Sequence, residues 1–100
     1  MWKVEFETLK AQKEIELLIK EKKITREDQE IISAWIRQIK LEGPEGIKAT
    51  AKWADHALRG EWDGYRSSAF SNRGRIIYCV KEKVVKILIA RITEKHDYRK

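Results

Sequence analysis

The chain has 100 residues, which is enough for one compact domain with a modest core and too few for two. Its formal net charge is +6, and its one cysteine, Cys79, cannot form an internal disulfide. No segment has the roughly 18 consecutive apolar residues of a membrane span, and no apolar run near the start indicates a signal peptide. We therefore expect a single domain over residues 1–100 in the cytoplasm, with no membrane contact and no metal or other cofactor.

The first half of the chain predicts a strand and two helices. Residues 2–6 alternate apolar and polar side chains, the period of a half-buried strand. Residues 8–23 carry apolar side chains at three- and four-residue steps, which predicts an amphipathic helix with Thr8 as its N-cap. Thr25 and Asp28 predict a capping box at the start of a second helix, which Gly43 and Pro44 end. The short link between the helices predicts an antiparallel helical hairpin.

The second half of the chain is typical of strands joined by tight turns. A short helix is expected within residues 47–57, followed by strands over 61–70, 75–81 and 84–92. Residues 71–74 and 81–83 have turn chemistry, so the three strands form an antiparallel meander. The predicted fold class is α+β, in the order β-α-α-β-β-β, with the helical hairpin packed on one face of the sheet.

The positive charge is confined to the second half of the chain. Residues 1–50 hold 10 basic and 10 acidic side chains, whereas residues 51–100 hold 12 and 6. A basic half can simply be a solvated surface, but here arginines occur together with aromatic residues that can stack on bases. These observations favour a polyanionic partner, either a nucleic acid or an acidic protein.

Three motifs in this basic half resemble a known family. Residues 55–67 read D-H-A-L-R-G-E-W-D-G-Y-R-S, residues 74–78 read G-R-I-I-Y, and residues 91–98 read R-I-T-E-K-H-D-Y. Together they resemble the RelE/ParE superfamily of toxin–antitoxin toxins, and most closely its YafQ-like branch. The resemblance covers about the last half of the chain, and the helical hairpin before it has the order that the family leads us to expect.

The resemblance implies a toxin that enters the ribosomal A site, cleaves mRNA and is silenced by a cognate antitoxin protein. Cleavage of RNA without a metal needs a base for the 2′-hydroxyl, an acid for the leaving oxygen and a cation for the phosphate. Histidine suits the first two tasks and arginine the third. The two histidines of the chain, His56 and His96, both fall in the motifs.

The resemblance assigns four catalytic candidates. His56 and His96 are candidates for acid–base catalysis, although His56 can also be an ordinary surface histidine and His96 part of a frayed chain end. Arg75 matches the arginine that contacts the scissile phosphate in family toxins, and its other interpretation is an ordinary arginine at a strand edge. Tyr98, separated from His96 by Asp97, is a candidate for substrate binding or base stacking.

Other arginines and aromatic residues have less specific predictions. Arg66, Arg73, Arg91 and Arg99 are candidates for RNA binding, and each can equally be solvated. Trp62 and Tyr65 are expected on opposite sides of the strand over 61–70. Ala69 stands where some YafQ-like toxins have a further catalytic histidine, and an acidic residue of that branch is replaced near Arg73.

Two alternative functions remain open from the sequence. One is a ParE-like toxin that shares the fold but inhibits DNA gyrase without nuclease chemistry, which the two histidines disfavour. The other is a non-catalytic nucleic-acid-binding module, for which the basic half is sufficient.

Overall fold

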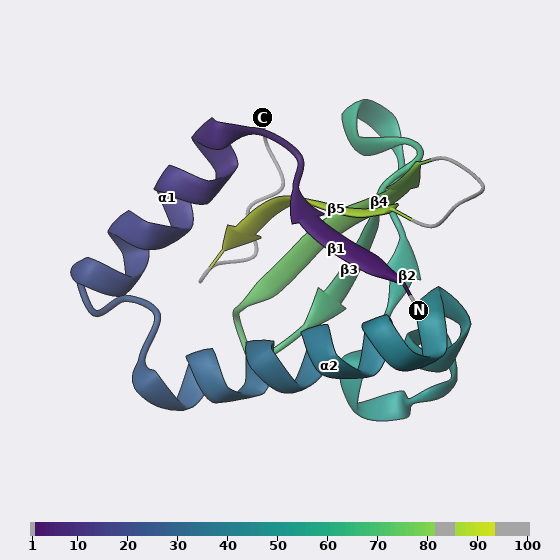
Figure 1. Cartoon of the computed structure of the whole chain (residues 1–100), viewed down its shortest axis with the longest axis horizontal. Helices are drawn as coiled ribbons and strands as arrows, with labels where there is room; N and C mark the ends of the chain where they lie inside the picture. Colours follow the sequence, from purple (N-terminus) through teal and green to yellow (C-terminus); the bar gives the residue numbers. More distant parts are fainter. Residues whose placement is uncertain (1, 82–85, 94–100) are drawn as a thin grey trace.

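The computed structural model describes residues 2–81 and 86–93. In chain order the elements are β1 (Lys3–Phe6), α1 (Leu9–Lys20), α2 (Arg26–Ala49), the 3₁₀ turn η1 (Ala51–Trp53), β2 (His56–Ala57), the 3₁₀ turn η2 (Gly60–Trp62), β3 (Arg66–Ala69), β4 (Arg75–Lys81) and β5 (Lys86–Thr93). One sheet has the strand order β1-β5-β4-β3-β2, in which β1 pairs parallel to β5 and the other pairs are antiparallel (Figure 1). The predicted α+β fold and meander are therefore confirmed.

Both helices begin where the sequence predicts. The Thr8 hydroxyl accepts a hydrogen bond from the Ala11 amide at 3.0 Å, which satisfies one of the unpaired N–H groups of the first turn of α1. At the start of α2 the Thr25 hydroxyl accepts from the Asp28 amide at 3.1 Å, and the Asp28 carboxylate accepts from the Thr25 amide at 3.0 Å. This reciprocal pair is the predicted capping box.

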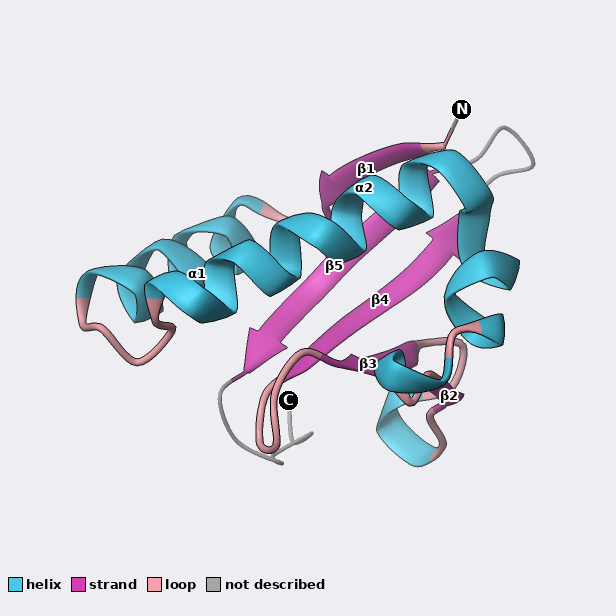
Figure 2. Ribbon diagram, turned by 90° about the horizontal axis from the view of Figure 1, so that it is seen from below, coloured by secondary structure: helices cyan, strands magenta, loops and turns pink. Residues whose placement is uncertain are grey.

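The helices cover one face of the sheet (Figure 2). The core on this face joins Ile15 of α1, Trp35 and Ile39 of α2, and Ile76 and Tyr78 of β4. The rings of Trp35 and Tyr78 meet edge to face, with centroids 5.1 Å apart. Because Ile76 and Tyr78 face the helices, the residues between and beside them on β4 face the opposite side of the sheet. Among the described residues, no helix is long and apolar enough to cross a membrane.

At Gly43 and Pro44, where the sequence predicted that the helix ends, a kink divides α2 into two helical segments. Gly43 has φ of 73° and ψ of −176°, so the chain kinks there and the helix resumes as far as Ala49. Pro44 fits the first turn of the resumed segment because no intrahelical partner is needed for its missing N–H. A Cβ atom at Gly43 would lie 2.5 Å from Nε1 of Trp2, so the kink brings the backbone against the indole. The separate helix expected within 47–57 is wrong, since the chain leaves α2 and forms η1.

The strand expected over residues 61–70 is also wrong in its first half. Gly60 and Gly64 have φ of +67° and +91°, left-handed values that a strand does not contain. The chain forms η2 and a turn, and β3 begins only at Arg66. Trp62 and Tyr65 are therefore not on opposite sides of a strand. Their rings meet edge to face with centroids 5.1 Å apart, and Trp62 is buried.

Candidate active site

His56 is an exposed histidine on β2, the short edge strand of the sheet. Its Nδ1 lies 3.1 Å from the carbonyl oxygen of Ala54. A carbonyl oxygen can only accept, so this hydrogen bond requires the proton on Nδ1 and leaves Nε2 of the neutral ring with its lone pair. Nε2 is therefore the nitrogen that can take a proton from a substrate.

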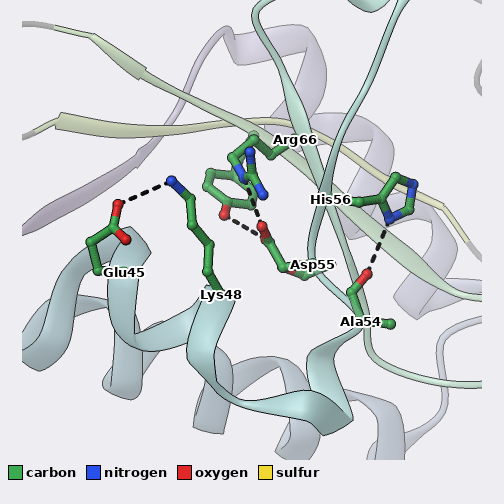
Figure 3. Close-up of polar contacts among 8 residues, drawn as sticks. Glu45, Lys48, Ala54, Asp55, His56 and Arg66 are labelled. Carbon is green, nitrogen blue, oxygen red and sulfur yellow. Dashed lines mark hydrogen bonds and ion pairs between the residues drawn. The ribbon is translucent and has the colours of Figure 1, made fainter.

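A left-handed residue turns His56 away from the core. Ala54 has φ of 45° and ψ of 42°, a conformation that costs a non-glycine residue roughly 1–2 kcal/mol. After this turn, consecutive side chains diverge. Figure 3 shows Asp55 pointing towards Arg66 while the His56 ring points away from both.

Asp55 lies at the centre of a buried hydrogen-bond network. Its Oδ1 accepts from Nε of Arg66 at 2.6 Å, and its Oδ2 accepts from the Ser68 hydroxyl at 2.7 Å and the Tyr78 hydroxyl at 2.6 Å. The Asp55 side chain is 0% exposed and that of Arg66 is 25% exposed. Burial by itself would lower the pKa of Arg66, but the hydrogen bond and charge of Asp55 outweigh it and raise the pKa. Burial, together with the hydrogen bond to Asp55, also raises the pKa of Tyr78.

Arg75 opens β4 and is held by the turn that precedes it. Its Nη1 donates to the carbonyl oxygens of Ser71 at 3.2 Å and Gly74 at 2.9 Å. The turn itself is closed by a hydrogen bond of 2.8 Å from the Gly74 amide to the Ser71 hydroxyl. Within the described part of the chain, Nε and Nη2 of Arg75 make no hydrogen bond. The guanidinium is thus fixed by backbone carbonyls and keeps donors for an anion.

The groove beside Arg75 has a volume of about 710 Å³. It lies where α2, η1 and the turn between β3 and β4 meet, and its walls include Ile31, Lys52, Trp53 and Asn72. Trp53 is only 2% exposed, so its ring does not offer an open stacking face. The charged side chains that line the groove are Lys52, Arg75 and Glu30, so its lining has one more positive than negative charge.

The sheet brings His56 and Arg75 to the same face. His56 pairs with Ser67 and Arg75 pairs with Ala69, two residues further along β3. Directly paired residues share a face and alternate residues return to it, so both side chains leave the sheet on the face opposite the helices. From strand spacing and rise, their Cα atoms are roughly 12 Å apart.

The arginine candidates do not share one environment. Arg66 pairs with Tyr78, on the helix-covered face, and its Nε bonds Asp55. Arg73 is exposed in the turn before Arg75. Arg91 is the β5 register partner of Ile77.

Three further candidates, His96, Tyr98 and Arg99, lie outside the described residues. Thr93, where the described part of β5 ends, is the register partner of Arg75.

A second polar cluster was not predicted from the sequence. The Tyr65 hydroxyl donates to Oε2 of Glu7 at 2.7 Å, and Sγ of Cys79 lies 3.9 Å from the same oxygen. The hydrogen bond to Glu7, with burial, raises the pKa of Tyr65 to about 12. Burial, and then the charge of Glu7, raises the pKa of the Cys79 thiol. No local pattern could indicate this cluster, because Glu7 and Tyr65 are 58 residues apart in the chain.

Across residues 2–81 and 86–93, no group of three or more His, Cys, Asp or Glu could hold a metal ion.

The fold is that of toxin structures already solved. A point mutant of YafQ from E. coli matches with a TM-score of 0.68 at 20% identity, over 92% of this chain and 91% of that one. A metal-bound toxin from Helicobacter pylori matches with a TM-score of 0.73 at 20% identity, over 96% of both chains. The YoeB-YefM toxin-antitoxin complex from Staphylococcus aureus matches with a TM-score of 0.67 at 17% identity, over 98% of this chain and 99% of that one. No family model and no curated protein matches the sequence. The fold expected from the RelE/ParE resemblance is confirmed.

Proposed function

We propose that this protein is the toxin of a toxin–antitoxin pair and cleaves mRNA on the ribosome without a metal ion. The observation that supports the proposal most is the placement of His56 and Arg75 on the sheet face opposite the helices, in a fold shared with solved toxin structures. An exposed imidazole and a fixed guanidinium are two of the three groups that the reaction needs. His96, three residues after the register partner of Arg75, is the proposed third.

The proposed reaction uses the 2′-hydroxyl of the RNA as the nucleophile. Nε2 of His56 takes the 2′-hydroxyl proton while the 2′-oxygen forms a bond to the adjacent phosphorus. The bond from phosphorus to the 5′-oxygen breaks, and His96 supplies the proton that this oxygen requires. Arg75 holds the charge that gathers on the non-bridging oxygens, and Tyr98 supports the substrate. The products are a 2′,3′-cyclic phosphate and a 5′-hydroxyl end.

The remaining arginines divide into two proposed roles. Arg73 on the open turn, with Arg91 and Arg99, supplies electrostatic binding of RNA in the ribosomal A site. Arg66 is proposed instead to hold Asp55, since its Nε is engaged in the buried ion pair. The excess of positive charge in residues 51–100 supports this assignment of the RNA to the second half of the chain.

A cognate antitoxin is the proposed protein partner, and the cytoplasm the proposed place of action. Support comes from the solved YoeB-YefM pair, which is a heterotetrameric toxin-antitoxin complex. An acidic segment of the antitoxin would complement the basic second half of the chain.

The test is a translation reaction with a reporter mRNA, followed by primer extension. We expect the wild type to create new 5′-hydroxyl ends within the reading frame. His56→Ala should lower the cleavage rate by about 10²–10⁴-fold, the range for loss of an acid–base group. Arg75→Ala should not cleave the reporter mRNA. Lys10→Ala, which removes an exposed positive charge from α1, is the control and should cleave at the wild-type rate.

Other outcomes would point to the alternatives. Growth arrest with broken DNA and intact mRNA would favour a ParE-like toxin acting on gyrase. Salt-sensitive binding of RNA that survives His56→Ala, with neither cleavage nor growth arrest, would favour a non-catalytic binding module.

A further inference from the structure

The segment that carries His56 has little apolar packing of its own. Ala54, His56 and Ala57 are all exposed, and β2 is only two residues long. The Asp55 side chain, by contrast, is 0% exposed. Asp55 is therefore the one buried side chain of residues 54–57, and the position of His56 depends on it.

Asp55 connects this segment to strands β3 and β4 of the sheet. Two of its three donors, Arg66 and Ser68, lie on β3, and the third, Tyr78, lies on the central strand β4. Tyr78 is itself 0% exposed and packs against Trp35 of α2. A displacement of Asp55 would leave the partly buried guanidinium of Arg66 and two buried hydroxyls without their acceptor, so the position of its carboxylate is closely defined.

A buried ion pair adds little net stability to a fold, because the cost of removing both charges from water offsets their mutual attraction. Well-packed apolar side chains of similar volume often stabilise a fold as much or more. What a fully satisfied polar network supplies is one defined orientation of the groups that it joins. The backbone next to Asp55 is where such an orientation has a chemical use, because the Ala54 carbonyl selects the tautomer of His56.

We propose that Asp55 is a positioning residue for His56. Its network fixes the junction between η1 and β2, so that the left-handed Ala54 directs its carbonyl to Nδ1 and leaves Nε2 of the exposed ring available to a substrate. The inference rests on the proposed function, in which Nε2 of His56 takes the substrate proton. It adds that the catalytic tautomer is set from the opposite, helix-covered face of the sheet.

The experiment compares variants that remove one contact each. Asp55→Asn removes the charge, while Ser68→Ala and Tyr78→Phe each remove one donor to Oδ2 and keep the ion pair. Ile39→Val, in the buried core on α2, is the control for a general loss of stability. For each protein, urea unfolding gives the stability and reporter cleavage gives the rate. Imidazole ¹⁵N chemical shifts, recorded at a pH where the rings are neutral, give the tautomer of His56. His96→Ala assigns the His56 signals, because the chain has two histidines.

The expected result is a loss of tautomer preference together with a loss of rate. Wild type should hold the proton on Nδ1, whereas Ser68→Ala and Tyr78→Phe should give a mixture of tautomers. Their cleavage rates should fall by about tenfold or more, since small displacements of a catalytic group cost this much. Ile39→Val should keep the wild-type tautomer and rate at a similar loss of stability.

Two results would overturn the inference. One is an unchanged Nδ1–H tautomer in folded Ser68→Ala and Tyr78→Phe. The other is a loss of rate no larger than that of Ile39→Val at equal stability. If the wild type itself cleaves no mRNA, the proposed function fails, and the tautomers of the same variants still decide whether Asp55 positions His56. Should Asp55→Asn not fold, the two hydroxyl variants decide the question.

Discussion

Replacement of Arg66 by methionine separates a structural arginine from an RNA-binding one. Methionine has similar length and no charge, so Arg66→Met leaves the Asp55 carboxylate buried without its cation. Removing one partner of a buried ion pair typically costs about 3–5 kcal/mol. The Arg66 side chain is 25% exposed, and Asp55 keeps the hydroxyls of Ser68 and Tyr78 as donors. We therefore discount the cost to about 2–3 kcal/mol.

Urea unfolding followed by tryptophan fluorescence measures this cost. For a domain of this size, about 2–3 kcal/mol corresponds to a fall in Tm of about 10–20 °C. A double-mutant cycle of Arg66→Met with Asp55→Asn should give a coupling free energy well above the roughly 0.5 kcal/mol of independent sites. Arg73→Met, at an exposed position, is the matched control and should change the free energy of unfolding by less than about 0.5 kcal/mol.

The two interpretations of Arg66 give opposite results. If Arg66 chiefly contacted RNA, its loss would leave the free energy of unfolding unchanged. The slope of RNA affinity against salt concentration, on logarithmic scales, would instead fall by about 1, the value for one phosphate contact. A loss of less than about 0.5 kcal/mol in Arg66→Met, or additive effects in the cycle, would refute the assignment of Arg66 to the Asp55 network.

Three further predictions concern other positions. Because its folded pKa is about 12 and its unfolded value is near 10, Tyr65 stabilises the fold fully below pH 10, and this contribution falls as the pH rises towards 12. After a discount for its exposed part, the loss should be about 1–2 kcal/mol in urea unfolding at increasing pH, and Tyr65→Phe should remove this pH dependence. Gly43→Ala should cost about 3 kcal/mol or more in the same assay, because φ of 73° with ψ of −176° suits glycine alone and a Cβ would lie 2.5 Å from Trp2. Ala54→Gly should instead gain about 0.5 kcal/mol, since relief of the left-handed strain exceeds the added entropy of the unfolded chain, and no gain would show that Ala54 is unstrained.

The amino-acid sequence by itself determined the elements whose signals are local. The caps at Thr8 and Thr25, the two amphipathic helices and the turn over residues 71–74 follow from spacings of a few residues, and the structure confirms each of them. The β-forming residues within 75–81 likewise predicted β4 with its observed bounds. The motifs also made His56 and Arg75 candidates for catalysis, because their residue types suit the proposed reaction, and this assignment stays a prediction.

The tertiary structure decided which of these residues lie together and on which face of the sheet. Gly43 reads as a helix end in the sequence, but packing of the chain around Trp2 makes it a kink within α2. Arg66 and Arg75 each begin a strand, yet strand register turns one towards the buried Asp55 carboxylate and places the other on the face opposite the helices. Register and burial arise from contacts between residues far apart in the chain, and local spacing contains no information about them. The sequence could therefore name the chemical groups, while only the packed sheet could assign each group to a face.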